Sequence, residues 1–370
     1  MWMIIFMVLP LVAVVYISWH VWVLLPWHAV WKALAIIAGL ACFSLLFMSM
    51  ARKFDSMPLP VAQTAYEIGT STLFVMLYLV MLFLVLDLGR LVHLVPKSLL
   101  VHNGVSAAVI LVLMAGVFIY GNIHYNNKVR VSLELESQKP LPKDYRIVML
   151  SDLHLGYHNP RKELARWVDM INSEQPDFIL IAGDIIDGSM RPLREERMHE
   201  EFHRLKAPVY ACLGNHEFYA GHPEALQFYK DAGIHLLIDS TAVIDSAIVV
   251  IGRDDRSNMR RKPIADLTNQ VDSLSSAPHA PYYTIVLDHQ PCNLDRAEMA
   301  HADFQLSGHT HRGQVWPISW ITDHIYECSW GRHTRGNTQF YVSSGIGIWG
   351  GKFRIGTQSE YVVADLRSGE

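Results

Sequence analysis

The first 125 or so residues of this chain are overwhelmingly apolar, whereas most of its charged residues follow Lys128. Four apolar stretches stand out in this first part, at 3–25, 33–50, 71–86 and 105–120. Each approaches the ~20 residues that a helix needs to cross a ~30 Å hydrocarbon core. The last two are short, so we expect them to extend into their flanks. Trp and Tyr side chains near the ends of the stretches suit a membrane interface. Residues 1–125 therefore predict a transmembrane unit of four helices.

The positive charges that flank these stretches bear on the orientation of the unit. With four spans both ends of the unit lie on one side, and Lys and Arg divide four to three in favour of that side: Arg52, Lys53, Lys128 and Arg130 against Lys32, Arg90 and Lys97. Cytoplasmic loops carry an excess of Lys and Arg, so this bias favours a cytoplasmic position for the domain that follows the unit. The ionisable residues lie at the span edges, with Asp87 placed at the interface near Arg90. We therefore expect anchoring, or lateral capture of a lipid, rather than ion transport.

The rest of the chain has the pattern of a linker followed by an α/β domain at 145–370. Residues 126–144 are polar and contain Pro140 and Pro142, as is typical of a linker. Short apolar runs predict strands at 146–150, 178–182, 209–213, 247–251, 283–287, 304–306, 340–343 and 361–364. Helices are predicted at 160–172, 194–205 and 223–232. Helices between the first strands indicate βαβ units, and the whole order fits two packed sheets with helices outside.

Five short motifs border these strands: Asp152-Leu153-His154, Gly183-Asp184-Ile185-Ile186-Asp187, Gly214-Asn215-His216-Glu217, Asp288-His289 and Gly308-His309-Thr310-His311. In open α/β sheets, ligands gather at the carboxyl ends of strands, so the fold can bring these distant segments to one edge. Each motif alone is weak evidence, because a Gly-Asp turn is common and a single histidine is more often structural. The ordered set of five, each at a strand end, is what predicts a functional site.

The residue types in these motifs can hold two metal ions. We expect Asp184 to bridge the ions, and the other predicted ligands divide between them: Asp152, His154 and His311 for one, and Asn215, His289 and His309 for the other. The i, i+2 spacing within the first and last motifs suits extended backbone at a strand exit, where alternate side chains point the same way. Mixed oxygen and nitrogen ligation suits Mn²⁺, Fe or Zn²⁺, and we favour Mn²⁺.

Two metals about 3.5–4 Å apart can hold a phosphate, acidify a bridging water and neutralise the developing charge. We therefore expect Asp184 and His216 to be catalytic, with His216 protonating the leaving oxygen or steadying the phosphoryl oxygens. Asn215 is expected to contact the substrate as well as a metal. Asp187 is interpreted as a residue that orients a ligand. The formal net charge of −4 argues against nucleic acid as a partner.

The five motifs, in this order, resemble those of the calcineurin-like metallophosphoesterase superfamily over about residues 145–366. The resemblance implies a four-layer α/β/β/α sandwich, a dinuclear centre with the ligand roles given above, and hydrolysis of phosphomonoesters, phosphodiesters or pyrophosphates. It is strongest to the bacterial membrane-attached branch, which implies an integral multi-pass protein of the cell (inner) membrane.

One residue departs from the form of that branch, in which the last motif often reads Gly-His-Thr-His-Gly-Gly-Gln. This chain has Arg312 at the fifth position. Its guanidinium is interpreted either as a substrate-binding group that clamps a second phosphate or a headgroup carboxylate, or as a solvent-facing side chain.

The membrane unit favours a lipid-borne phosphate ester as substrate, such as a phospholipid headgroup diester, a lipid pyrophosphate or a nucleotide-linked lipid precursor. The segment 345–351, Gly-Ile-Gly-Ile-Trp-Gly-Gly, is either a loop that admits an acyl chain or a glycine-rich turn packed on the sheet. The alternative functions are a tethered phosphodiesterase for soluble nucleotides and a non-enzymatic membrane scaffold or sensor. All seven ligand positions hold competent residues, which weighs against the last of these.

Overall fold

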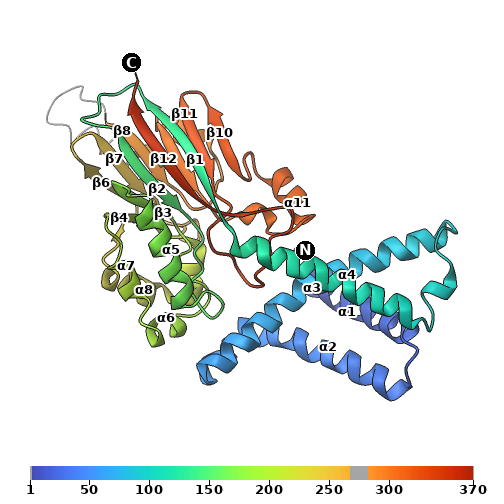
Figure 1. The fold of residues 1–370 in the computed structure, drawn as a ribbon. Helices are drawn as coiled ribbons and strands as arrows, with labels where there is room; N and C mark the ends of the chain where they lie inside the picture. Colours follow the sequence, from blue (N-terminus) through green and yellow to red (C-terminus); the bar gives the residue numbers. More distant parts are fainter. Residues whose placement is uncertain (1, 267–281, 370) are drawn as a thin grey trace. The chain divides into compact units, whose positions relative to one another are not determined.

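Figure 1 shows the computed structural model, which describes residues 2–266 and 282–369. The chain divides into two compact units, Met1–Ile123 with Gly350–Lys352, and His124–Trp349 with Phe353–Glu370. The first unit consists mainly of helices and the second is an α/β unit built on two sheets.

Long apolar helices make up most of the first unit: α1 (Trp2–Leu24), α2 (Ala29–Met50), α3 (Leu59–Leu91) and α4 (Gly104–Asn126). The 3₁₀ turns η1 (Lys53–Ser56) and η2 (Lys97–Leu99) lie in two of the connections. Among the described residues, α2, α3 and α4 are long and apolar enough to cross a membrane, whereas the apolar segment Val8–Leu24 of α1 is shorter. Three candidate spans are thus shown, and the fourth stays a prediction. As expected, α3 and α4 extend beyond 71–86 and 105–120.

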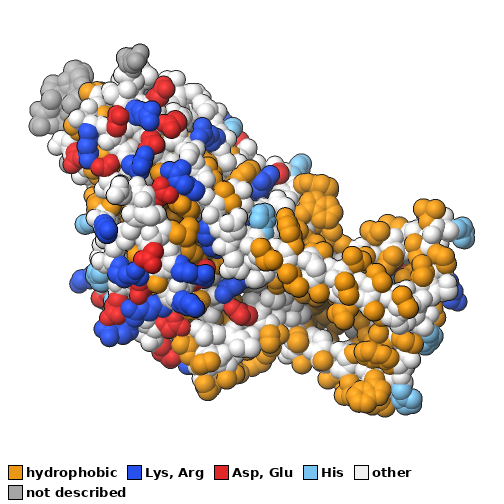
Figure 2. Space-filling model, viewed as in Figure 1, with side chains coloured by type: hydrophobic (Ala, Val, Ile, Leu, Met, Phe, Trp, Pro, Cys, Tyr) orange, Lys and Arg blue, Asp and Glu red, His pale blue; other side chains and the backbone are white. Residues whose placement is uncertain are grey.

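Apolar side chains cover the visible surface of the helical unit, whereas Lys, Arg, Asp and Glu gather over the α/β unit (Figure 2). The interfacial position of Asp87 stays a prediction, and the structure shows that this residue makes a polar contact between helices. Asp87 Oδ2 accepts a hydrogen bond from the Tyr16 hydroxyl at 2.7 Å and lies 3.1 Å from His20 Nε2. His20 is buried and stacks on Phe83, so this polar cluster joins α1 to α3.

Two six-stranded sheets form the frame of the second unit, in the orders β1-β12-β2-β3-β4-β5 and β10-β11-β9-β8-β7-β6. The strands are β1 (Lys128–Ser137), β2 (Tyr145–Leu150), β3 (Phe178–Ala182), β4 (Val209–Cys212), β5 (His235–Leu236), β6 (Ser240–Ile244), β7 (Ile248–Gly252), β8 (Tyr283–Leu287), β9 (Phe304–Ser307), β10 (Gly331–Arg335), β11 (Thr338–Val342) and β12 (Ser359–Ser368). The helices and turns of this unit are α5 (Arg161–Ser173), α6 (Arg191–Glu195), α7 (His199–Phe202), α8 (Asn215–Asp231), α10 (Asp295–Met299), η3 (His311–Gly313) and α11 (Ile318–Ile325).

Both sheets are mixed. In the first sheet β2, β3, β4 and β5 run parallel, and β12 is antiparallel to β2. In the second sheet β7, β8, β9 and β11 run parallel, with β6 and β10 antiparallel at the two edges. Because the carboxyl ends of parallel strands lie at one edge of a sheet, the turns after β2, β3 and β4 come together there.

Alternating apolar residues build the core of the second unit. Ile147 and Met149 of β2 join a cluster with side chains of both sheets, whereas Val148 and Leu150 join a second cluster that includes residues of α5 and α8. This split follows from the pleat, which sends successive side chains to opposite faces. A third cluster packs β7, β8 and β11 against α10 and its neighbours. Each such buried aliphatic side chain contributes roughly 1.5–3 kcal/mol to folding.

Two predicted elements differ from the observed ones. Much of the predicted linker 126–144 is strand β1, which pairs in parallel with β12. The sequence pattern did not predict this strand because its exposed positions are polar, although Leu133 and Leu135 are buried. The predicted helix 194–205 is instead two short helices, α6 and α7, because the backbone of Arg197 between them is left-handed (φ 51°) and interrupts the helix.

Candidate metal centre

The seven predicted ligands all follow strands that end at the same region of the second unit. Asp152 and His154 follow β2, Asp184 follows β3, and Asn215 opens α8 directly after β4. From the second sheet, His289 follows β8, and His309 and His311 follow β9. Side chains from segments more than 150 residues apart thereby reach hydrogen-bond distance, as between His154 and His311.

The backbone at these positions is not the extended backbone that the i, i+2 spacing predicted. The following predicted ligands all have left-handed φ values: Asp152 (53°), His154 (45°), Asp184 (51°), His309 (70°) and His311 (47°). Asp and His tolerate this region better than most residues, yet each such residue costs of order 1 kcal/mol. The packing around the site therefore holds these side chains in place against a local preference, as is common at functional sites.

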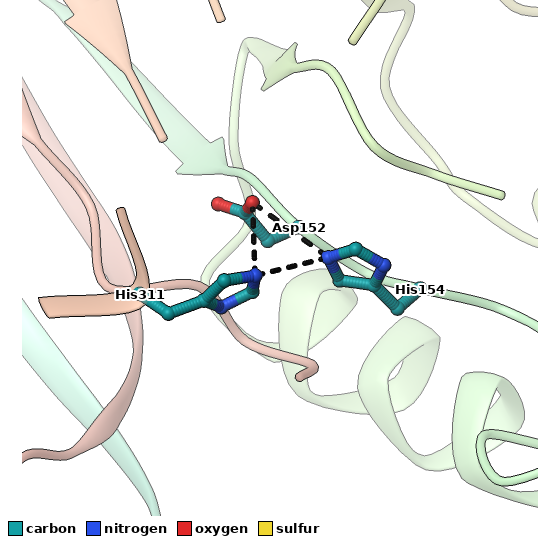
Figure 3. Close-up of side chains that lie close together, drawn as sticks. All are labelled: Asp152, His154 and His311. Atoms are coloured by element: carbon teal, nitrogen blue, oxygen red, sulfur yellow. Dashed lines mark hydrogen bonds and ion pairs between the residues drawn. The ribbon is translucent and has the colours of Figure 1, made fainter. Parts of the chain in front are cut away.

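A first group consists of Asp152, His154 and His311, drawn in Figure 3. Asp152 Oδ1 lies 3.8 Å from His154 Nε2 and 3.5 Å from His311 Nε2, and the two Nε2 atoms are 3.0 Å apart. The two buried acceptor nitrogens thus face each other beside a carboxylate. That arrangement suits three ligands around one cation.

The protonation of this group also fits a metal ion. His154 Nδ1 donates to Asp187 Oδ1 at 3.2 Å, which leaves Nε2 to carry the lone pair. Burial lowers the pKa of His311 to about 3, so its imidazole is neutral at pH 7. Burial opposes a charge on His154 as well, but its hydrogen bonds to Asp152 and Asp187 raise its pKa to about 10 without an ion. A divalent cation would replace the proton between the two imidazoles.

A second group consists of Asp184, His289 and His309. His289 Nδ1 donates to the Ala182 carbonyl at 2.8 Å and directs Nε2 to within 3.1 Å of Asp184 Oδ2. His309 Nδ1 lies 2.9 Å from Asn215 Oδ1, so the amide oxygen joins the group. Burial, followed by the charge of His289, lowers the pKa of His309 to about 4, which leaves a neutral imidazole.

Asp184 lies between the two groups. Its Oδ2 is 3.6 Å from His154 Nε2 of the first group and 3.1 Å from His289 Nε2 of the second. Its other oxygen, Oδ1, accepts from the backbone N–H of His216 at 3.0 Å. Burial opposes ionisation of Asp184, but the His289 and His216 imidazoles hold its pKa well below its usual range. One ionised carboxylate therefore faces both groups.

Asp187 lies between the imidazoles of His154 and His216. Its Oδ1 lies 3.2 Å from His154 Nδ1 and 3.4 Å from His216 Nδ1. The rings of His154 and His216 meet edge to face with centroids 4.5 Å apart. The His216 side chain is 15% exposed, whereas that of His154 is fully buried. His216 is thus placed beside the ligands but within reach of solvent.

Glu217 is a residue of the site to which sequence reasoning gave no role. Its buried carboxylate accepts from the backbone N–H groups of Asp184 (3.3 Å), Ile186 (3.1 Å) and Gly214 (2.7 Å), and from the Tyr229 hydroxyl (3.0 Å). It fixes the turn after β3 to the start of α8. The sequence feature that could have indicated this role is the capping-box spacing of Gly214 and Glu217 at the start of α8.

Gly308, in the last motif, can only be glycine where it stands. A Cβ atom there would lie 2.3 Å from Asp152 Oδ2. The His309 N–H, next along the chain, donates to both oxygens of Asp152 at 3.0 and 3.2 Å. The missing side chain therefore lets the turn after β9 approach the carboxylate of the first motif.

Arg354 is a second residue that the sequence did not single out. It is fully buried and donates to the carbonyls of His311 (2.7 Å), Gly347 (3.2 Å) and Ser344. Burial lowers its pKa to about 10, so it stays charged at neutral pH. No carboxylate lies among its hydrogen-bond partners in the described chain, and backbone carbonyls take its protons instead. Arg354 thus ties the turn that holds His311 to the glycine-rich segment.

Residues 345–349 of the glycine-rich segment belong to the second unit and form a packed turn. Ile346 and Ile348 are buried, and Trp349 is partly buried. The N–H groups of Ile346 and Gly347 donate to the carbonyls of Ser151 (3.2 Å) and Asp152 (3.0 Å). Of the two sequence interpretations, these contacts favour the glycine-rich turn, which here supports the first motif, over a loop that admits an acyl chain.

The Arg312 guanidinium lies over the Trp330 ring, 4.0 Å from its centroid. The indole in turn donates to the Glu360 carboxylate at 3.0 and 3.1 Å. The backbone of Arg312 is left-handed (φ 49°), and the side chain is partly buried. Arg312 is therefore held beside the last motif by a cation–π contact rather than extended freely into solvent.

Comparisons with known proteins agree with this geometry. The family described as calcineurin-like phosphoesterase matches residues 145–313. An uncharacterized metallophosphoesterase of Campylobacter jejuni is 30% identical over 262 residues, 70% of this chain and 68% of that protein. One of Aquifex aeolicus is 30% identical over 63% of this chain and 89% of its own length. A zebrafish (Danio rerio) transmembrane protein with metallophosphoesterase domain is 29% identical over 76% of this chain and 70% of that protein.

The chain belongs to the calcineurin-like metallophosphoesterase family. It is therefore a hydrolase that acts on phosphoric ester bonds, and its second unit has the mixed-sheet α/β fold of that family. The family uses divalent metals, and the two groups around Asp184 are candidate ligands for them. The similarity to a transmembrane protein agrees with the apolar helices α2, α3 and α4.

Proposed function

We propose that this protein is a membrane-anchored phosphoesterase with a dinuclear metal centre, which hydrolyses a phosphodiester or pyrophosphate bond of a lipid or lipid-linked substrate. The observation that carries the proposal is the position of Asp184 Oδ2 between His154 Nε2 at 3.6 Å and His289 Nε2 at 3.1 Å. Two sets of buried imidazoles and carboxylates on either side of one carboxylate are what a pair of cations requires.

Two divalent ions in this site would supply an acidified water as nucleophile and positive charge for the phosphoryl oxygens. The residues of the chain have complementary tasks. Asp187 keeps the proton on His154 Nδ1, and the Ala182 carbonyl does the same for His289 Nδ1, so that both Nε2 lone pairs face inward. His216, partly exposed beside them, is placed to donate a proton to the leaving oxygen.

We further propose that Asn215 and Arg312 contact the substrate phosphate or its neighbouring group. Asn215 has an oxygen 2.9 Å from His309 Nδ1, so its amide nitrogen is left to donate. Three apolar clusters, one with side chains of both sheets and one against each outer face, support the four-layer α/β/β/α arrangement. By the distribution of Lys and Arg, we place the catalytic unit on the cytoplasmic side of the cell membrane.

An apolar patch next to the metal centre favours a lipid-borne substrate. Helix α11 begins five residues after η3, which holds His311. Trp316 and Trp320 meet edge to face with centroids 5.3 Å apart, and Trp320, Ile321 and Ile325 are exposed. Exposed aromatic and aliphatic side chains in such a group are typical of surfaces that contact a partner or a lipid.

The test is a panel of phosphate esters assayed with Mn²⁺ and with chelator. We expect Mn²⁺-dependent hydrolysis, faster on phosphodiesters or pyrophosphates in micelles or vesicles than on soluble analogues with the same headgroup. Equal rates on soluble and micellar forms, or preference for cyclic nucleotides that survives deletion of residues 1–125, would favour a tethered nucleotide phosphodiesterase instead. Absence of any metal-dependent turnover would contradict both enzymatic proposals.

A further inference from the structure

A polar cavity with a volume of about 240 Å³ lies in the catalytic unit near the metal centre. We call it the cationic pocket. Five basic side chains and one carboxylate are among its lining residues: Arg253, Arg256, Arg261, Lys262, Arg296 and Asp288. None of them belongs to the predicted ligand set, although Asp288 precedes the ligand His289.

The two more buried arginines already have partners. Arg261 donates to both oxygens of Asp288, at 2.5 and 3.3 Å. Arg253 lies 3.4 Å from Asp239 Oδ1 through Nε and donates to the Lys262 carbonyl at 2.6 Å. Burying a charged group without a partner is costly, and these contacts provide partners for both guanidinium groups. Both arginines still line the cavity.

The three basic side chains at the rim are exposed: Arg256, Lys262 and Arg296. No ion pair joins the side chain of any of them to another residue within 2–266 or 282–369. Like charges around one cavity repel each other, and their potential attracts an anion into it. Among the described residues, the charges of these three side chains are therefore not neutralised by an ion pair, and they leave the opening of the pocket cationic.

The cationic pocket lies near the metal centre, because its lining residue Asp288 directly precedes the candidate ligand His289. Gln290 donates to Asp255 Oδ2 at 2.9 Å, which holds the turn after β7 against the end of β8. On the other side, Tyr326 lies near His309, with ring centroids 6.4 Å apart. The positive charge of Arg256 also acts on Tyr326, although burial is the main cause of its raised pKa.

We infer that the cationic pocket binds a second phosphate group of the substrate, separate from the phosphate that is hydrolysed. Guanidinium groups form paired, charge-assisted hydrogen bonds with phosphate oxygens. A substrate whose scissile phosphate lies at the metal centre would extend its second phosphate along the end of β8 to Arg256 and Arg296. This inference rests on the proposed function, since it names the class of substrate as a molecule with two phosphates.

The kinetic test compares two soluble substrates that differ only in the second phosphate. They are the 5′-(p-nitrophenyl phosphate) of thymidine, with and without a 3′-phosphate. In the double variant Arg256→Glu/Arg296→Glu we expect KM to rise tenfold or more for the 3′-phosphorylated substrate, by on the order of one decade per lost charged contact. We expect kcat, and both constants for the substrate without 3′-phosphate, to stay unchanged.

Arg260→Glu is the matched control, because Arg260 is exposed in the same segment but does not line the pocket. It makes the same substitution at one position, which is half the charge change of the double variant, and should leave KM for both substrates as in the wild type. An equal effect of the double variant and Arg260→Glu would indicate a general electrostatic effect and overturn the inference. So would a rise of KM for both substrates alike.

A binding test keeps the inference independent of catalysis. Cys292 lines the cationic pocket and is partly exposed, so its alkylation reports on occupancy. In chelator-treated full-length protein we expect inorganic pyrophosphate to slow alkylation of Cys292 in the wild type and Arg260→Glu, but not in the double variant. No protection in the wild type would overturn the inference even if the enzyme is active.

The two tests together separate the possible failures. Protection of Cys292 without discrimination between the two substrates would show a site for a free anion and overturn the assignment to the substrate. Protection with no hydrolysis of either substrate would leave the pocket supported as a phosphate site and count against the proposed catalytic function. Discrimination in KM together with protection is the expected result.

Discussion

Asp184 faces both candidate metal groups and also accepts a hydrogen bond from a backbone N–H in the first turn of α8. Its Oδ1 accepts from the His216 N–H and its Oδ2 faces His154 and His289. Substituting it therefore tests the proposed bridging role more directly than substituting any single histidine.

We predict that Asp184→Ala abolishes turnover and removes at least one metal ion per chain, while the protein still inserts and folds. The reason is that neither cation would retain its shared carboxylate. Metal content by elemental analysis, together with activity on a chromogenic phosphodiester, checks this. Asp169→Ala, a change of a surface aspartate (66% exposed side chain), serves as control. Retained activity in Asp184→Ala would remove the bridging assignment.

Glu217 gives a second prediction at this scale, concerning stability. Glu217→Gln replaces a carboxylate that accepts four hydrogen bonds by an amide with a single acceptor oxygen. We expect the free energy of unfolding of the catalytic unit to fall by about 1–3 kcal/mol, because buried backbone N–H groups lose their partner. Denaturant titration followed by tryptophan fluorescence measures the loss. Glu224→Gln, at an exposed position of the same helix, should change it by less than about 0.5 kcal/mol.

At the scale of elements, the last turn of α4 is part of the catalytic unit and touches the support of the metal centre. Tyr125 is fully buried, and its hydroxyl donates to Asn159 Oδ1 at 2.6 Å. The Asn159 amide donates to the carbonyls of Leu153 and His154, each at 3.1 Å. A single hydrogen-bonded chain thus joins the end of an apolar helix to the backbone of a candidate metal ligand.

We predict that Tyr125→Phe weakens metal binding by roughly twofold to fivefold without unfolding the unit. Losing one hydrogen bond costs about 1 kcal/mol, and part of that loss reaches the His154 turn through Asn159. Titration of chelator-treated protein with Mn²⁺ gives the dissociation constant. The control is Tyr361→Phe, which loses a comparable hydrogen bond to Glu174 Oε1 (3.0 Å) far from the ligands in sequence. Equal shifts in both variants would contradict a role for the link.

For the whole molecule, the metals should contribute to folding as well as to chemistry. Buried carboxylates and imidazoles surround the site, and removal of the cations leaves only protons on the imidazoles to balance the carboxylates. We therefore predict that chelation lowers the Tm of the catalytic unit, and that 100 Kd of added Mn²⁺ restores about 2.7 kcal/mol per site. Scanning calorimetry with and without Mn²⁺ checks this, with the Asp184→Ala variant as the control that should respond less. An unchanged Tm would argue against bound cations in the folded protein.

The amino-acid sequence alone was sufficient to predict three features of this protein. The apolar stretches fixed the long helices of the first unit, because a helix that crosses a membrane needs a long run of apolar residues. Short apolar runs located the buried strands β2, β3, β4 and β8, because strands buried on both faces are mostly apolar. The sequence also singled out the candidate ligand residues, because each follows a predicted strand, and their role as ligands stays a prediction.

Only the tertiary structure decided the remaining features, which depend on contacts between distant segments. Strand β1 exists because β12 pairs with it, and its polar alternate residues concealed it in the sequence. Glu217 and Arg354 act through hydrogen bonds to backbone groups of distant turns, Glu217 to Ile186 and Arg354 to His311, and their residue types did not indicate these partners. The cationic pocket likewise needs residues 253–262 and 288–297 to lie face to face. The local sequence pattern indicates which face of a helix or strand is apolar, whereas only the packing of these elements determines which polar groups come into contact.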